Sequence, residues 1–568
     1  MKKLFCIKTV SALVLTLFFS AASAFAAPWS FGVMGDTQWT TTDPAGTNPN
    51  TVPMSIINQV NQQFINAGVK FVIEVGDLTD DGNDVSEVTR AAAAQSLYNH
   101  GIGYFPFRGN HETYGTNNNY GIPIFQANYP QTRGLNNIFE ASNFNSPVSV
   151  SSDLDGMSYS FDYGAHGNKA RFVIIDAWAT PGKVDNNADG YAYGYTINDQ
   201  QAWISGRLNK HTRDTEHAFV FAHQPLIAEN HQDTIFSGYT NANPDWQNAF
   251  FASLQNNNVK YFISGHDHVH QRSIIASPDG NSNVQELICA SNSSKFYAPK
   301  SVTDPKWFDQ KGRETSVSQE LYHVGYYIYT VAGPRVTVDY YSDDHGNWQS
   351  DASYPTGPSG AGSHITPTLN FVKKETWGYS LNGKEFLVAQ GQSYSNVQDR
   401  HSDTVAKILD GINSSTTKDG SGRPLTKTVD TGWSHEMHGI DSDILTLWGM
   451  ADLGTEQTDT FTLSLSYDHD RVNHEELKRG LFGLVTEDDN GSWINAVDKN
   501  FGGTKKFVVG AWDPSYKLGT YGIDPVKHTA WAVVNYNGDF AVARFQQKDR
   551  DCKAEEHQQQ DDCSKDRD

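Results

Sequence analysis

The chain has 568 residues, enough for several domains, and its 43 Lys and Arg against 65 Asp and Glu give a formal net charge of −22. Hydrophobic residues make up 38% and aromatic residues 12%, which excludes a collagen, a coiled coil, a polytopic membrane protein and a generally disordered chain. So acidic a chain repels phosphate backbones, which argues against sequence-independent binding of nucleic acid.

The first 26 residues have the pattern of an export signal. Three lysines among the first eight residues precede an apolar run over residues 10–19, and the small-residue sequence Ala24-Phe25-Ala26 follows. The run is too short to span a bilayer, and the A-x-A sequence is typical of a cleavage site. We therefore expect residues 1–26 to be a signal peptide, and the mature protein to be periplasmic or extracellular with no transmembrane segment.

Apolar strands alternate with amphipathic helical stretches from residue 29 to about residue 342. Strands are expected at 31–35, 71–76, 104–108, 158–163, 171–176, 219–222, 261–264, 325–330 and 335–340, and helices at 52–67 and 85–99. Continuous apolar strands separated by helices predict an α/β domain, over residues 28–342, whose sheet is buried on both faces.

The pattern changes after a Gly-, Ser- and Pro-rich segment, 343–368, that is expected to be a linker. Residues 369–545 contain short alternating runs, such as 460–467 and 530–534, which predict an all-β sandwich with a core of its own. The tail 546–568 lacks large apolar residues, so we expect it to be disordered; Cys552 and Cys563 there could close a small disulfide loop.

Five short polar clusters follow the apolar strands of the first domain. They are Gly35-Asp36-Thr37-Gln38, Gly76-Asp77, Gly109-Asn110-His111-Glu112, His223 and Gly265-His266-Asp267-His268. A single Asp or His at a strand end is usually a cap or a solvated turn, but five such clusters at the same end of their strands point to one site. Carboxylates, an amide oxygen and imidazoles suit borderline metal ions such as Mn, Fe or Zn.

This ordered set of clusters resembles the motifs of the calcineurin-like metallophosphoesterase family, which are D-x-H, G-D, G-N-H-[ED], a single His and G-H-x-H. The resemblance covers residues 30 to about 342. It implies a four-layer fold of two packed sheets flanked by helices, and a centre of two divalent or trivalent metal ions. The ligands it implies are Asp77 as the bridge, Asp36 and His268 in the first site, and Asn110, His223 and His266 in the second.

One position departs from the family pattern, because Gln38 stands where the first motif usually has His. The amide oxygen of Gln is a harder and weaker ligand than imidazole, and we keep Gln38 as a candidate ligand of the first metal.

The resemblance also implies a reaction: a hydroxide that bridges the metals attacks a phosphate ester, and His111, next to Asn110, donates a proton to the leaving group. We expect a phosphomonoesterase, with a phosphodiesterase or nucleotidase as the alternative. A retained fold that serves as a non-catalytic binding or adhesion module is an alternative of another class. Trp39, Tyr114, Glu229 and His231 are candidates for contacts with the substrate, although each is more simply a loop-packing residue.

Overall fold

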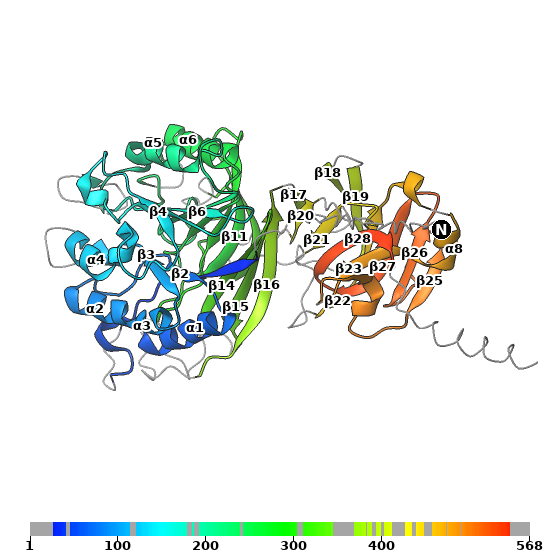
Figure 1. Cartoon of the computed structure of the whole chain (residues 1–568), viewed down its shortest axis with the longest axis horizontal. Coiled ribbons are helices and arrows are strands. Elements are labelled where there is room, and N and C mark those ends of the chain that lie inside the picture. The colour runs from blue at the N-terminus through cyan, green and yellow to red at the C-terminus, as the bar shows by residue number, and fades with distance from the viewer. Residues whose placement is uncertain are drawn as a thin grey trace, which may run out of the picture.

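The structure is a computed structural model, and Figure 1 shows two bodies along its longest axis, with the N-terminal α/β body on the left. It describes residues 27–40, 46–113, 121–178, 185–186, 192–238, 242–303, 311–344, 368–381, 383–388, 393–398, 403–411, 427–433, 439–447, 457–472, 474–488 and 490–545. The expected signal peptide, the C-terminal tail and most of the expected linker lie outside these residues. Within them, no helix has the length and apolar character needed to cross a membrane.

The first sheet of the N-terminal body has six strands. In spatial order they are β16 (Phe371–Ser380), β15 (Arg335–Asp343), β14 (Gly325–Ala332), β1 (Trp29–Met34), β2 (Phe71–Glu74) and β3 (Gly103–Pro106). β1, β2 and β3 are parallel, so the loops that follow them emerge at one edge of the sheet. β14 runs antiparallel to β1 and forms the expected hairpin with β15.

The second sheet has eight strands. They are β13 (Glu314–Glu320), β11 (His270–Ala276), β12 (Asn283–Ile288), β10 (Tyr261–Ser264), β9 (His217–Ala222), β6 (Ala170–Ile175), β5 (Tyr159–Tyr163) and β4 (Ser142–Asn145). β12, β10, β9 and β6 are mutually parallel. Here too, the carboxyl ends of central strands meet at one edge.

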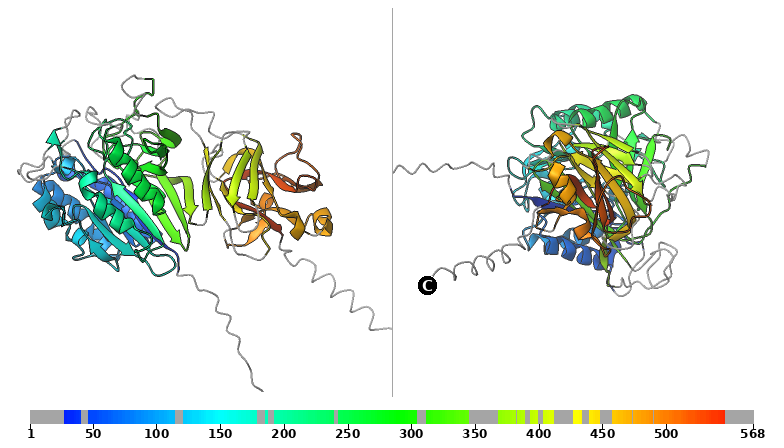
Figure 2. Two further views of the ribbon diagram at one scale, coloured as in Figure 1. Left: turned by 90° about the horizontal axis from the view of Figure 1, so that it is seen from above. Right: turned by 90° about the vertical axis from the view of Figure 1, so that its right-hand side faces the viewer.

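Helices cover the outer faces of both sheets, as the views in Figures 1 and 2 show. The α-helices among the described residues of this body are α1 (Met54–Ala67), α2 (Asp84–Ala93), α3 (Gln95–Tyr98), α4 (Ile122–Asn128), α5 (Ile197–Leu208) and α6 (Pro244–Asn256). Aromatic residues of the two sheets form the central core; Phe31, for example, meets Phe172 edge to face with ring centroids 5.0 Å apart. This is the expected four-layer arrangement, with α1 to α4 against the first sheet and α5 and α6 against the second.

The helix expected over residues 85–99 is interrupted at Ala94, between α2 and α3. α1 agrees closely with expectation: its buried residues Ile56, Val60 and Phe64 recur at helical spacing, and Gly68, with φ of 65°, ends it in the left-handed conformation.

The boundary between the two bodies differs from the expected one. β16 lies in the segment assigned from sequence to the C-terminal domain, yet it pairs with β15 along its whole length and extends the first sheet. Trp377 and Tyr379 on β16 are buried in the core between the two sheets of the N-terminal body. Apolar and polar residues alternate along β16 as they do along the later strands. This is why the sequence alone assigned β16 to the C-terminal domain. The N-terminal body therefore reaches at least to Ser380.

The C-terminal body is an all-β pair of sheets, as expected. One contains β17 (Gly383–Val388), β20 (Lys427–Trp433), β21 (Ile444–Leu447), β28 (Gly538–Arg544), β23 (Phe482–Glu487) and β24 (Trp493–Asn495). The other contains β18 (Ser393–Gln398), β19 (Asp403–Asp410), β22 (Gln457–Ser466), β27 (Thr529–Tyr536), β26 (Thr520–Asp524) and β25 (Lys506–Val509). Side chains from both sheets, such as Leu463 and Val542, form one core, and α8 (His474–Arg479) packs beside it.

Candidate metal centre

The expected ligands come together where the strands of both sheets end. Asp36 follows β1, Asp77 follows β2, His223 directly follows β9, and His266 follows β10. An isolated bridge between Gly35 and Ser291 ties the two sheets together at this edge. Two sheets whose parallel strands end side by side thus bring together residues that lie up to about 230 positions apart in the sequence.

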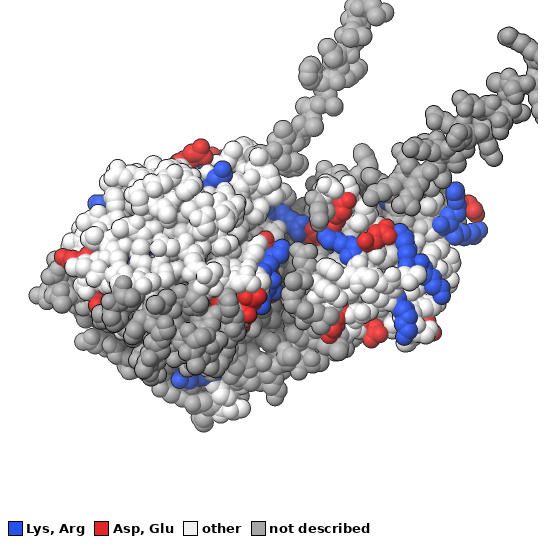
Figure 3. Space-filling view, turned by 90° about the horizontal axis from the view of Figure 1, so that it is seen from below, with Lys and Arg blue, Asp and Glu red and all other residues white. Residues whose placement is uncertain are grey.

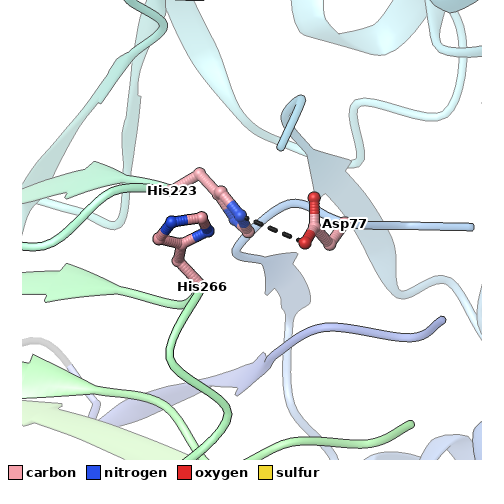
Figure 4. Close-up of side chains that lie close together, drawn as sticks. All are labelled: Asp77, His223 and His266. Carbon is pink, nitrogen blue, oxygen red and sulfur yellow. Dashed lines mark ion pairs between the residues drawn. The ribbon is translucent and has the colours of Figure 1, made fainter. Parts of the chain in front are cut away.

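Two groups of buried ligand atoms form at this edge, and they share one residue. Asp77, His223 and His266 form one group, and Asp36, Asp77 and His268 form the other; within each group the ligand atoms all lie within 4.8 Å of one another. Figure 4 shows the group of Asp77, His223 and His266, which we call the second group, with His223 reaching towards the Asp77 carboxylate. These are the two sets that the motifs imply, with Asp77 common to both.

Hydrogen bonds hold His223 with one ring nitrogen towards the site. Its Nδ1–H donates to the Val75 carbonyl at 2.7 Å, so Nε2 faces the other ligands. That Nε2 lies 3.3 Å from Asp77 Oδ2 and 3.3 Å from Asn110 Oδ1. Asn110 therefore joins the group of Asp77 and His223, as expected.

His266 and His268 are oriented in the same way by their second ring nitrogens. His266 Nε2 lies 3.0 Å from Asp233 Oδ1, and His268 Nδ1–H donates to the Lys295 carbonyl at 2.8 Å. The remaining nitrogen of His268, Nε2, lies 3.6 Å from Asp36 Oδ1. Such partners fix the tautomer and the ring plane of a metal-binding histidine.

The buried oxygens at the first site fit a cation. Asp36 Oδ2 and Gln38 Oε1 are buried without a hydrogen-bond partner among the described residues, and the Gln38 amide nitrogen donates to Asp77 Oδ2. An unpaired buried carboxylate oxygen costs free energy unless a positive charge compensates it. The donor set of carboxylates, imidazoles and amide oxygens suits two borderline metal ions, so the residues present fit the centre that the motifs imply.

Four of the candidate ligands have an unusual backbone conformation. Asp36, Asp77, His266 and His268 have φ values of 36°, 51°, 74° and 52°, a region that residues with a Cβ rarely occupy. Such conformations persist only when the surrounding structure imposes them, and they are typical of functional sites.

Two glycines of the motifs make room for the ligands. A Cβ on Gly109 would collide with the Asp77 carboxylate, and a Cβ on Gly76, where φ is 92°, would collide with the His223 ring. In these two motifs a glycine is needed because a ligand side chain lies where a Cβ would be, and also because glycine allows the turn.

The charges of the ligands depend on one another. Burial raises the pKa of Asp36 to about 8, an effect that His223 partly opposes. Burial also disfavours ionised Asp77, but the nearby His223 and His111 outweigh it and hold the pKa of Asp77 below its usual range. Burial lowers the pKa of His268 well below its usual value, so this imidazole is neutral near pH 7, the form that binds metal.

His111 lies beside the ligands, at a more exposed position. Its backbone N–H donates to Asp77 Oδ1 at 3.1 Å, and its Nδ1–H donates to the Asp80 carbonyl at 2.6 Å. Its side chain is 16% exposed, whereas those of His223 and Asp77 are at most 2% exposed. Nε2 of His111 is thus the nitrogen directed away from the loop that holds it.

Several supporting residues were missed by sequence reasoning. Glu112, the last residue of the third motif, accepts from the backbone N–H groups of Leu78, Thr79 and Gly109. It thereby ties the Asp77 loop to the Asn110 loop. Its place in the motif was a usable signal; Asp233 offered none, because its contact with His266 is purely tertiary.

The candidates for substrate contacts have mixed outcomes. Trp39 is fully buried, Glu229 pairs with buried Lys311, and Tyr114 lies outside the described residues. The His231 ring packs against the His266 ring at a tilt of 32°, with ring centroids 4.2 Å apart, and its Nδ1 lies 2.8 Å from Asp267 Oδ1. Trp39 and Glu229 are therefore packing residues, and His231 supports the second group.

Comparisons with known proteins agree with the motifs. Residues 30–270 match the family model of calcineurin-like phosphoesterases. The comparison with curated proteins gives no match.

Similar solved structures include a dimetal phosphatase from Danio rerio, with 14% identity over 55% of this chain and 95% of the other and a TM-score of 0.34. A purple acid phosphatase from yellow lupin (Lupinus luteus) has 13% identity, coverages of 56% and 51%, and a TM-score of 0.37. An NAD nucleotidase from Haemophilus influenzae has 13% identity, coverages of 54% and 47%, and a TM-score of 0.30.

The family match and the arrangement of the ligands define the class of the N-terminal body. Residues 30–270 of this body match the calcineurin-like phosphoesterases and contain both ligand groups, which supports a metal-dependent phosphoester hydrolase. The C-terminal body is not assigned to a family.

Proposed function

We propose that the protein is an exported phosphomonoesterase with two metal ions at the strand ends. The observation that carries the proposal is the pair of buried ligand groups that share Asp77. Two ligand groups with one carboxylate in common would suit two metal ions held close together, as two-metal hydrolysis of phosphate esters requires. Asp36, Gln38 and His268 would hold one ion, and Asn110, His223 and His266 the other.

Metal ions held there supply Lewis-acid polarisation of the phosphate oxygens and activation of water. The chain's own residues orient them: Val75, Asp233 and Lys295 fix the three ligand imidazoles. Because the ligand side chains are almost fully buried, bulk water is excluded around them, and charges there interact more strongly than at the surface.

His111 is placed to give a proton to the leaving oxygen. Since its Nδ1–H is engaged with the Asp80 carbonyl, the proton that moves is the one on Nε2, at the exposed side of the site. An imidazole is suited to this work because its ordinary pKa lies near neutrality.

Export is part of the proposal and is supported by the basic, apolar and small-residue pattern of residues 1–26. Fractionation of the source cells and N-terminal sequencing of the mature protein test it. Intact protein that keeps residues 1–26 and stays in the cytoplasm would contradict it.

The central experiment measures bound metal in the purified full-length protein together with hydrolysis of a model phosphomonoester and a model phosphodiester. We expect two metal ions per chain and the higher kcat/KM for the monoester. A higher kcat/KM for the diester would favour the phosphodiesterase alternative. Two bound metals with no hydrolysis of either ester would favour a non-catalytic module.

A further inference from the structure

A loop that no motif marks completes the metal centre. We call residues 291–297, which follow β12, the 291–297 loop. Its backbone is tied to the first ligand loop: Asn292 N–H donates to the Gly35 carbonyl at 3.1 Å, and Ser294 N–H donates to the Gln38 carbonyl at 3.1 Å. The Lys295 carbonyl accepts from His268. The loop is therefore held in a fixed position relative to the ligands.

Lys295 extends from this loop across the exposed side of the site. Its Nζ forms an ion pair with Asp80 Oδ1 and lies 3.4 Å from His111 Nε2. The Lys295 and Asp80 side chains are 12% and 18% exposed, values close to that of His111. These three side chains are among those of the centre that solvent reaches.

The ammonium of Lys295 can bind one more acceptor. An ammonium has three N–H donors, and one of them is engaged with the Asp80 carboxylate; His111 Nε2, which carries a proton of its own in the proposed function, lies 3.4 Å away. The ammonium lies beside the nitrogen from which the proposed function takes its proton. A cation at this position attracts the oxygens of a phosphate.

We propose that Lys295 is a substrate-binding residue whose ammonium binds a non-ester oxygen of a phosphomonoester, and that Asp80 is its positioning residue. The proposal rests on the proposed function and deepens it, because it names a source of selectivity for monoesters. Near neutral pH a monoester phosphate carries close to two negative charges and a diester carries one. A fixed positive charge therefore favours the monoester.

The test compares Lys295→Gln and Lys295→Arg with Lys300→Gln in the full-length, metal-loaded protein. Lys300 is exposed in the same stretch of chain, so its variant makes the same charge change away from the site. We expect Lys295→Gln to raise KM for the monoester, and the inhibition constant of inorganic phosphate, by about tenfold or more, as for loss of a hydrogen bond to a charged group. The increase should be smaller for the diester, Lys295→Arg should recover part of the loss, and Lys300→Gln should behave as wild type.

The rival explanation is that Lys295 only neutralises Asp80. In that case the double variant Asp80→Asn/Lys295→Gln would regain wild-type affinity, since no uncompensated charge remains. We expect it to keep the weak phosphate affinity of Lys295→Gln, measured also by calorimetric titration with inorganic phosphate, which needs no turnover. Wild-type affinity in Lys295→Gln or in the double variant would overturn the proposal. Failure of the proposed function would appear separately, as wild-type protein that hydrolyses no phosphate ester.

Discussion

The two bodies of the protein are both built from two packed sheets, but they differ in the residues that lie at their strand ends. Each buries a core between two sheets. In the N-terminal body, the strand-end loops carry buried ligands and four non-glycine residues with positive φ. Among the described residues from 383 onwards, His528 is the one non-glycine residue with positive φ, and no metal-binding group is found. Four of the candidate ligands thus combine burial with a positive φ, a combination that is not found among the described non-glycine residues of the C-terminal body.

The surfaces differ as well. On the face shown in Figure 3, Lys and Arg side chains gather on the C-terminal body, while the same face of the N-terminal body shows few charges. The two bodies meet through Arg335 at the start of β15, whose guanidinium pairs with Asp539 on β28 and donates to Thr446 at 3.3 Å. The described residues of the C-terminal body supply no ligand of the metal centre, so we expect catalysis to need the first body alone.

The largest effect is expected from Asp77→Asn. Because Asp77 belongs to both ligand groups, removal of its charge should release both metals and reduce hydrolysis by more than about a hundredfold. The measurements are metal content and kcat/KM. Asp524→Asn is the matched control in the C-terminal body, where this buried aspartate only accepts from backbone N–H groups. Two metals bound to Asp77→Asn with full activity would refute the shared-ligand assignment.

His111→Ala should keep both metals and lower kcat by ~10²–10⁴-fold, the usual contribution of a general acid. The loss should shrink for esters with good leaving groups, which need little protonation. A series of monoesters with leaving groups of different pKa checks this. An equal loss across the series would instead assign His111 to binding of the phosphate.

A pair of glycine variants contrasts the two bodies directly. Gly109→Ala forces a Cβ against the Asp77 carboxylate, so we expect activity and metal affinity to fall by about 10- to 100-fold. Gly522→Ala forces a Cβ against Trp531 in the C-terminal body, so it should lower that body's unfolding temperature and leave metal content unchanged. Equal loss of metal in the two variants would contradict the separation of roles.

The N-terminal body should lose stability in mild acid through His217. This buried imidazole lies 2.9 Å from the Tyr379 hydroxyl on β16 and 2.7 Å from the Gly333 carbonyl, and burial lowers its pKa to about 4. The unfolded chain binds the proton first, near pH 6.5, so the stabilisation is complete above that pH and lost as pH falls towards about 4. The shift corresponds to roughly 3 kcal/mol of unfolding free energy. Denaturant titrations of wild type and His217→Gln should differ in pH dependence over this range.

The smallest effect is expected from removal of the C-terminal body after residue 381. That chain keeps β16 and should hydrolyse a small monoester within about twofold of the full-length rate, because no ligand is lost. A chain ending at residue 342 is the informative contrast. It lacks Trp377 and Tyr379, so the central core is opened and the body should unfold at lower temperature. If the chain that ends at residue 381 folds and binds its metals but loses most of its hydrolytic activity, the C-terminal body completes the site.

The candidate ligands could be picked out from local sequence because each one lies shortly after an apolar strand and several follow a glycine. Asp36, Asp77, His223 and His266 could be found in this way, since parallel strands must bring their carboxyl ends to one edge. The spacing of apolar residues predicted an α/β domain with a sheet buried on both faces and the β-sandwich, whereas the four-layer arrangement of two sheets was implied by the family resemblance.

Tertiary structure alone decided the rest. β16 alternates like a strand of the C-terminal body, and only the free edge of β15 and the core position of Trp377 place it in the first sheet. Lys295 has no local signal either, because it meets His111 across 184 residues of sequence and Asp80 across 215. Local patterns specify which face of an element is buried, whereas the partner of a strand edge or of a charged side chain depends on how distant elements pack.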